Sequence, residues 1–227
     1  MEGPIGTELL EGLRAHRLIG LSFTYSGGAN GVATKARPVR GPEDLRGLKV
    51  GAIGDEVNEA WLRSLGAAPV PIEHRNEPVL AMSRDGRLDA VVITWRNFEQ
   101  ATLDQAYKYF SLPGSTYLVS VTYINEKFYE SLPPAYRALL KTASQEAGRI
   151  ERARTIELNE DSRRLMMAKG VRPVHLTETG KKAFLDAVRP AYQGTLEALL
   201  GRSLLDRIRR APDGSVHPVV PAVFAGR

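Results

Sequence analysis

The stretch between Leu48 and Thr94 constrains the fold most, because its pattern predicts three short apolar strands that alternate with two helices. Its last strand, residues 88–94 (LDAVVIT), is apolar almost throughout, which is typical of a strand buried on both faces. Short connections in a β-α-β-α-β order predict a parallel sheet with right-handed crossovers, and hence an α/β fold. The expected elements are strands over 48–53, 68–72 and 88–94, and helices capped by Asp55 and Asn76.

A second strong feature is the stretch from residue 135 to residue 170, which contains no proline. Its apolar residues recur at near-helical spacing, and an unbroken helix of about 36 residues would be ~54 Å long. Because one small lobe cannot house such a helix, we expect it to connect two lobes. Ser26-Gly27-Gly28 is expected to end a strand that begins at Leu18. The other expected elements are a helix over 4–16, strands over 18–25, 30–36, 107–112, 116–124 and 171–176, a helical turn over 42–45, a helix capped by Thr177 that ends near 200, and a short helix over 204–208.

Composition excludes several classes of protein. The 227 residues suit one large domain or two modest lobes. The absence of cysteine excludes disulfides, thiolate metal sites and cysteine nucleophiles. The net charge of +5 comes from scattered basic residues, so we expect no nucleic-acid partner. No apolar run has the length of a membrane span, so the chain is not expected to be embedded in a membrane, and its first residues do not have the pattern of a signal peptide.

The polar residues do not form a catalytic or metal-binding motif. The four histidines lack the spacing of a helical metal pair, and no G-x-S-x-G nucleophile elbow is present. The glycine-rich residues 26–31 lack the phosphate-loop pattern, so a turn or hinge is favoured there. Asp44 and Asp55 stand at expected helix starts, where capping explains them. We therefore expect no catalytic residue, no metal and no cofactor.

The ends of the predicted parallel strands indicate where a ligand binds, because open parallel sheets bind ligands at that edge. Thr94-Trp95-Arg96-Asn97 combines an aromatic ring, a guanidinium and an amide, which together can stack on and hydrogen-bond a small organic anion. The alternative is that Trp95 packs under the next helix and Arg96 is solvated. The residues expected to bind the ligand, between two lobes, are Tyr25, Asn30, Thr94, Trp95, Arg96, Asn97 and Tyr117.

Several short pieces of the chain follow one another in a characteristic order: Gly3-Pro4-Ile5-Gly6, Thr34-Lys35-Ala36-Arg37-Pro38-Val39, Pro42 to Val50 (PEDLRGLKV), Ser64-Leu65-Gly66-Ala67 with Pro69 and Pro71, Asp85-Gly86-Arg87-Leu88-Asp89, and Asn125 to Pro133 (NEKFYESLP) followed by the long helix. This ordered set resembles the solute-binding proteins of tripartite ATP-independent periplasmic (TRAP) transporters, the DctP-like family. The resemblance covers about residues 3–210 and implies a two-lobed architecture of the type II periplasmic-binding-protein kind. It also implies a periplasmic protein that closes on a small organic acid-like solute and delivers it to TRAP membrane subunits.

The chain departs from the family pattern at the expected carboxylate clamp. The family has an arginine that grips the carboxylate of the ligand where this chain has Gly51, and a polar stretch where this chain has residues 90–93 (AVVI). Three alternatives stay open: a replacement by Arg96, Arg75 or Arg37, a less acidic ligand, or the loss of binding. The resemblance also implies a signal peptide and about half of the first lobe ahead of the segment matched here, so the first lobe is expected to be incomplete.

The expected organisation has two lobes. The residual first lobe comprises 1–26, 120–133 and 171–210; the second lobe comprises 27–119 around the core 48–94; a bridging helix spans 134–170 and a tail spans 211–227. The expected function is capture of a small organic acid-like solute for a TRAP transporter. One alternative is a truncated or divergent remnant without ligand binding. The other is a hydrolase on a similar scaffold, for which the sequence shows no nucleophile–base pair.

Overall fold

The structure is a computed structural model that describes residues 3–53, 56–72, 78–113 and 116–210. The expected caps Asp55 and Asn76 and the expected tail lie outside the described residues. The expected cap Thr177 is confirmed, because its hydroxyl accepts a hydrogen bond from the Gly180 N–H at 3.1 Å. Within the described part, no helix combines the length and the apolarity that a membrane span needs.

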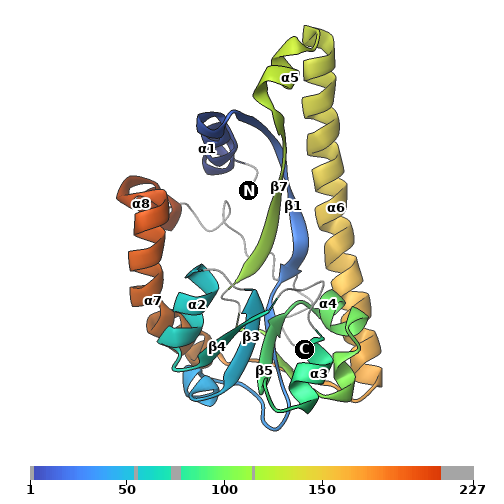
Figure 1. Ribbon diagram of the computed structural model, residues 1–227, viewed down its shortest axis with the longest axis vertical. Helices are drawn as coiled ribbons and strands as arrows, with labels where there is room; N and C mark the ends of the chain where they lie inside the picture. Colours follow the sequence, from blue (N-terminus) through green and yellow to red (C-terminus); the bar gives the residue numbers. More distant parts are fainter. Residues whose placement is uncertain (1–2, 54–55, 73–77, 114–115, 211–227) are drawn as a thin grey trace.

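The molecule has two regions of unequal size (Figure 1). One region is a six-stranded sheet with helices on its faces. The other is a two-stranded antiparallel ribbon of β1 (Leu18–Ala29) and β7 (Tyr117–Asn125), which lies beside the long helix α6 (Pro134–Ala168). The long helix runs past both regions, as the sequence predicts, and its 35 residues confirm the expected unbroken helix.

The six-stranded sheet contains the predicted β-α-β-α-β unit. Its strand order is β4-β3-β5-β2-β6-β8, and β3 is parallel to both β4 and β5, which confirms the expected parallel core. The sheet as a whole is mixed, because β2 enters from the ribbon and pairs antiparallel with β5 and β6. The strands are β2 (Gly31–Thr34), β3 (Lys49–Ile53), β4 (Ala68–Ile72), β5 (Ala90–Ile93), β6 (Tyr109–Ser111) and β8 (Arg172–Val174).

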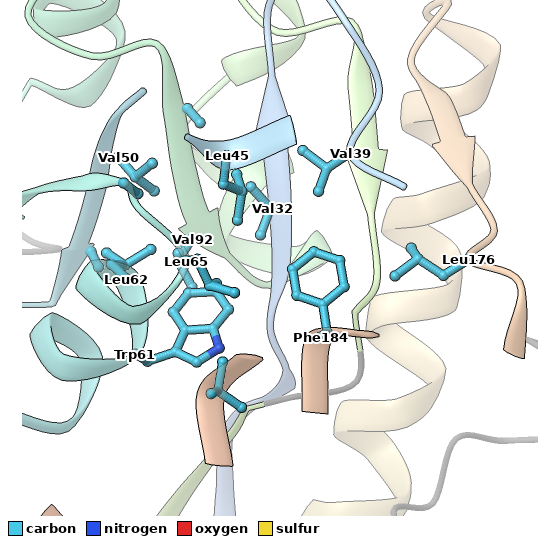
Figure 2. Close-up of a cluster of buried hydrophobic side chains, with 14 residues drawn as sticks. Val32, Val39, Leu45, Val50, Trp61, Leu62, Leu65, Val92, Leu176 and Phe184 are labelled. Atoms are coloured by element: carbon cyan, nitrogen blue, oxygen red, sulfur yellow. The ribbon is translucent and has the colours of Figure 1, made fainter. Parts of the chain in front are cut away.

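Two apolar clusters cover the faces of this sheet. In Figure 2 the Trp61 indole and the Phe184 ring point into the cluster on one face, around Val32 and Leu65. The cluster on the other face contains Trp95, Phe98 and Phe110. The remaining elements are helices α1 (Pro4–Gly12), α2 (Glu56–Ser64), α3 (Val79–Arg84), α4 (Trp95–Gln100), α5 (Glu126–Ser131), α7 (Glu178–Leu200) and α8 (Arg202–Arg210), and 3₁₀ turns at Leu13–His16, Pro42–Leu45 and Leu103–Gln105.

The segment 171–210 lies differently from the expectation that it joins residues 1–26. β8 forms the edge of the six-stranded sheet, and Phe184 and Val188 of α7 pack into the cluster on its face. Only α8 reaches towards the start of the chain, where Arg207 forms an ion pair with Glu8 at 2.5 Å. Burial of the apolar side of α7 on the sheet accounts for this placement.

The break expected at Ser26-Gly27-Gly28 is wrong, because β1 continues to Ala29. Its register with β7 shifts between Tyr25 and Gly28, which is an irregularity of the bulge type. Gly27 has φ 111°, and a Cβ built on it would lie 2.9 Å from Cγ2 of Thr94. Glycine therefore bends this strand and allows it to pass close to α4 without ending it.

Candidate ligand-binding site

A polar seam runs along the second half of α6, where the helix faces β1 and α4. We define the seam by Glu151, Thr155, Asn159 and Ser162, which recur every three or four residues and so share one side of the helix. The Glu151 carboxylate accepts a hydrogen bond from the Tyr25 N–H at 2.7 Å. It also accepts one from the Thr155 hydroxyl at 2.6 Å. Hydrogen bonds thus attach this part of the long helix to the strand that links the two regions.

Asn159 is the member of the seam that joins the most elements. Its side-chain Nδ2 donates to the Gly27 carbonyl of β1 at 2.8 Å and to the Thr155 carbonyl at 2.9 Å. Its Oδ1 accepts from the Arg96 N–H, in the first turn of α4, at 3.1 Å. One amide therefore ties the ribbon, the long helix and a helix of the six-stranded region together.

A cavity of about 800 Å³ opens at this meeting point. It is lined by β1 at Ser26 and Gly27, by the beginning of α3, by α4, by β7 at Leu118, and by the seam residues Thr155 and Asn159. The first turn of α3 supplies apolar walls at Val79 and Leu80, and α4 supplies the polar side chains of Arg96, Asn97 and Gln100. A concave site with mostly apolar walls and a few polar groups is typical of small-molecule binding. Its volume is also in the usual range for such sites.

Among the residues that the structure describes, Arg96 is the basic side chain that lines this cavity. Thr94 caps α4 by accepting a hydrogen bond from the Asn97 N–H at 3.3 Å, which places Arg96 and Asn97 in the first turn of the helix at the cavity wall. The Arg96 guanidinium donates to the Glu99 carboxylate at 2.8 Å. This bond uses one end of a group that has five N–H donors, so an anion in the cavity can bind the others.

Glu99 is itself held in its charged form. The hydrogen bond from Ser162 has the largest effect, and the bond and charge of Arg96 add to it, so the pKa of Glu99 lies below its ordinary value although burial opposes the shift. The carboxylate therefore remains ionised near neutral pH and keeps the Arg96 side chain oriented along α4. The Ser162 hydroxyl donates to the Glu99 carboxylate, so the seam contacts the Arg96–Glu99 ion pair at the cavity wall.

Three other residues predicted for the site, Tyr25, Tyr117 and Asn30, are not among those that line the cavity. Tyr25 and Tyr117 face each other with ring centroids 5.4 Å apart, one residue away from the lining positions Ser26 and Leu118. Burial raises the pKa of Tyr117 to about 12, with a smaller contribution from Tyr25, so this phenol stays protonated at neutral pH. Asn30 is buried at the end of β1, and its N–H donates to the Thr116 carbonyl at 3.2 Å.

Trp95 lies in the apolar core. Its indole stacks on Phe110 at 3.7 Å between ring centroids, and only 2% of the residue is exposed. Trp95 therefore packs as in the alternative, under the helix that it begins. Arg96 does not follow that alternative, because Arg96 and Asn97 line the cavity. The structure therefore brings together Arg96 and Asn97 with Thr94 behind them, and it leaves Trp95 outside the lining.

Gly51 faces a packed apolar environment. A Cβ built on it would lie 3.2 Å from the Leu88 methyl carbons and 3.4 Å from Cδ1 of Ile72. An arginine stem at this position would therefore have to displace core side chains. Of the other proposed replacements for the clamp, Arg37 donates to the Asp44 carbonyl at 3.1 Å and does not line the cavity, and Arg75 lies outside the described residues. Arg96 is the candidate that lines the cavity.

Sequence reasoning missed the seam, although the signal for it was present. Thr155 and Asn159 are polar residues four apart on a helix that the sequence predicts from its apolar spacing alone. A polar stripe at helical spacing indicates a polar side of the helix, which faces either solvent or, as here, polar groups of other elements. Among the residues that the structure describes, no group of three or more histidine, cysteine or acidic residues is placed to hold a metal ion.

Comparison with known proteins places these observations in a family. The profile described as "Bacterial extracellular solute-binding protein, family 7" (DctP) matches residues 1–198. Among curated relatives, the 2,3-diketo-L-gulonate-binding periplasmic protein of Escherichia coli is 26% identical over 190 residues, which are 83% of this chain and 56% of that protein. The C4-dicarboxylate-binding periplasmic protein of Rhodobacter capsulatus is 25% identical over 199 residues, 87% of this chain and 59% of that protein. The chain thus spans less than two thirds of the length of either relative.

Solved structures agree with this placement. A TRAP periplasmic solute-binding protein of Ralstonia eutropha with bound (S)-2-acetolactate has a TM-score of 0.80 and 25% identity, with 91% of this chain and 66% of that chain covered. One from Bradyrhizobium in complex with D-galacturonate has a TM-score of 0.78 and 28% identity, with 91% and 67% covered. These likenesses confirm the α/β fold expected of a type II, two-lobed binding protein. The chain belongs to family 7 of the bacterial extracellular solute-binding proteins, the DctP-like proteins of TRAP transporters.

Proposed function

We propose that this chain binds a small organic acid in the cavity between α3, α4, α6 and the β1–β7 ribbon, as the solute-binding component of a TRAP transporter. In this proposal it captures the solute outside the cytoplasm, in the periplasm, and delivers it to the TRAP membrane subunits. It binds without chemical conversion of the solute. The observation that carries the proposal is the position of Arg96 and Asn97 at the wall of a cavity of about 800 Å³ where the two regions meet.

The chemistry of the cavity supports an acidic solute. The Arg96 guanidinium can bind a carboxylate with the donors that Glu99 does not use, and Asn97 and Gln100 offer amides for hydroxyl or carbonyl oxygens. Val79 and Leu80 provide apolar walls that pack against carbon atoms. Because Glu99 balances part of the positive charge, we expect the site to prefer one carboxylate with neutral polar groups over two carboxylates.

The relatives support the same class of ligand. The names of the proteins compared above specify acetolactate, galacturonate and diketogulonate, each a carboxylate that also carries hydroxyl or carbonyl groups. A C4-dicarboxylate is specified for another relative. We therefore expect a hydroxy- or keto-acid to bind this chain more tightly than a simple dicarboxylate does.

Calorimetric titration of the 227-residue chain tests this proposal. The panel is D-galacturonate, 2-acetolactate, 2,3-diketo-L-gulonate and succinate. Arg96→Ala should weaken the tightest of these interactions by about 10-fold or more, because a hydrogen bond to a charged group contributes about 1.5–3 kcal/mol.

The control is Arg154→Ala. Arg154 forms the same Arg-x-x-Glu pair with Glu157, also at 2.8 Å, on an exposed part of α6 outside the cavity lining. This variant should bind like the wild type. Binding of no acid in the panel, or equal binding by the Arg96 variant and the wild type, would contradict the proposal.

A further inference from the structure

A second cavity lies at the edge of the six-stranded sheet, where β8 pairs with β6. Its volume is about 450 Å³, and none of its lining residues lines the first cavity. Three segments that are far apart in the sequence meet there: Pro38 with Arg40, Tyr109 of β6, and Arg172 to His175. This cavity is therefore separate from the proposed solute site and needs its own explanation.

The backbone around this cavity is held in place by specific bonds. Arg172 and Tyr109 stand opposite each other in the parallel register of β8 and β6, so their side chains share one face of the sheet. Over that face, the Val39 N–H donates to Oγ of Ser111 at 3.2 Å. The Asp44 carboxylate accepts from the Arg40 N–H at 2.8 Å, which fixes the direction of the loop that carries Arg40. The two arginines thus reach the same cavity from anchored positions.

The lining of this cavity has a strong charge imbalance. Arg40, Arg172 and the imidazole of His175 line it together with the Tyr109 phenol, and its lining contains no carboxylate. The Asp44 carboxylate, which hydrogen-bonds the loop that carries Arg40, accepts from the backbone N–H groups of Arg40 and Gly41. Within the described part of the chain, no hydrogen bond or ion pair engages the guanidinium of Arg40 or of Arg172. By contrast, Arg163 binds Glu160 through two nitrogens, at 2.8 and 2.6 Å.

We propose that this second cavity binds a small oxyanion of the phosphate type through Arg40 and Arg172. Two positively charged side chains that line one cavity attract a doubly charged oxyanion more strongly than a neutral molecule. Guanidinium matches the spacing of phosphate oxygens and binds them in pairs, while the Tyr109 hydroxyl is a neutral donor for a third oxygen. Pro38 and Pro173 restrict the backbone on two sides of the cavity, so on binding it is mainly the exposed arginine side chains that have to be ordered. The proposal is independent of the solute site.

The probe for this site is inorganic phosphate, with glycerol 3-phosphate in a parallel titration. Amide chemical shifts of the isotope-labelled 227-residue chain are recorded at constant ionic strength, with chloride as the competing anion. We expect phosphate to shift amides at 39–40, 109–111, 172, 174 and 175 and to leave 96–101 unchanged. A response to both probes identifies the anion group as what is recognised, whereas a tighter response to glycerol 3-phosphate identifies a phosphate monoester as the source. Absence of shifts at these positions with both probes overturns the proposal.

Variants decide whether the two guanidinium groups carry the binding. Arg172→Gln and Arg40→Gln should each weaken phosphate binding by about 10-fold, because each removes charge-assisted hydrogen bonds and keeps much of the side-chain stem. Arg154→Gln, at an exposed paired arginine outside both cavities, should have no effect. Thermal unfolding of each variant checks that the fold is kept. Phosphate binding that survives the loss of both Arg40 and Arg172 contradicts the proposal.

Discussion

The six-stranded region and the β1–β7 ribbon are stabilised in different ways. The largest fully buried side chains, among them Trp61, Trp95 and Phe110, all lie in or against the six-stranded sheet. In the ribbon and the adjoining helices, Tyr123 is 58% exposed, Phe128 56% and Tyr136 61%. The ribbon buries the smaller side chains Ile19, Leu21 and Phe23 of β1 and depends in addition on strand pairing and on the polar seam of α6, whereas the sheet region depends mainly on the burial of large apolar side chains. The first cavity lies where these two kinds of structure meet, so binding there depends on both.

The largest expected effect is that of removing a core aromatic side chain. Phe110→Ala should lower the free energy of unfolding by about 3–5 kcal/mol, because it removes a ring that stacks on Trp95 and leaves a cavity. Phe128→Ala, the matched change in α5, should cost less than about 0.5 kcal/mol since that residue is more than half exposed. Urea unfolding of both variants measures the difference. Equal losses would show that the two regions are stabilised alike.

The next effect concerns the bend through which β1 connects the regions. Gly27→Ala should cost about 2 kcal/mol, because its backbone has a φ of 111° and the new Cβ would lie 2.9 Å from Thr94. Gly12→Ala is the control: this glycine is in the last turn of α1 with φ −56° and no atom near its Cβ position, so alanine should be neutral or slightly stabilising. Thermal and urea unfolding report the result, and equal stability of the two variants would contradict the strain at Gly27.

A smaller effect separates stability from binding. Asn159→Ala should cost about 1 kcal/mol and should also weaken solute binding, because the Gly27 carbonyl and the Arg96 N–H both lose their partner at the cavity wall. Asn125→Ala should cost about as much, since Asn125 caps α5 by accepting from the Phe128 N–H at 3.1 Å, but it should leave binding unchanged. Urea unfolding and calorimetry on both variants test this. If both variants lost binding equally, the seam would have no special role.

The smallest effect is a change in pH dependence. The folded-state pKa of Glu99 is below its ordinary value, so the stability that it contributes is present above the unfolded-state pKa and is lost as the pH falls through the folded-state pKa. Ser162→Ala removes the largest cause of that shift, so the variant should be less stable than the wild type near neutral pH, and the difference should shrink in acid.

Ser144→Ala is the control for this pH dependence, because Ser144 faces β1 from the same helix and bonds the Ser22 hydroxyl at 2.9 Å without a carboxylate. Its effect on stability should not vary with pH over the range in which Glu99 titrates. Urea unfolding at about pH 7 and about pH 3 compares the two serine variants. A pH-independent loss in the Ser162 variant would contradict the assigned cause of the pKa shift.

The sequence predicts the parallel core and the long helix because periodic apolar spacing is a local signal. The predicted end of the strand at Gly27 is wrong, because glycine ends many strands but only bends this one. The local pattern cannot show this, since the deciding contact of Gly27 is with Thr94, far away in the sequence. It left open whether Trp95 binds a ligand or packs in the core, because the stacking on Phe110 is a tertiary contact. The seam was missed because Glu151 and Asn159 bind groups of β1, far away in the sequence.

Hydrogen exchange with and without each acid of the panel tests most directly whether a solute binds where the two regions meet. The account predicts that the tightest-binding acid slows amide exchange on both sides of the first cavity, at residues 25–29 of the ribbon and 94–101 of the six-stranded region, and leaves α5 unchanged. Slower exchange on one side alone, or no change with any acid of the panel, would contradict it.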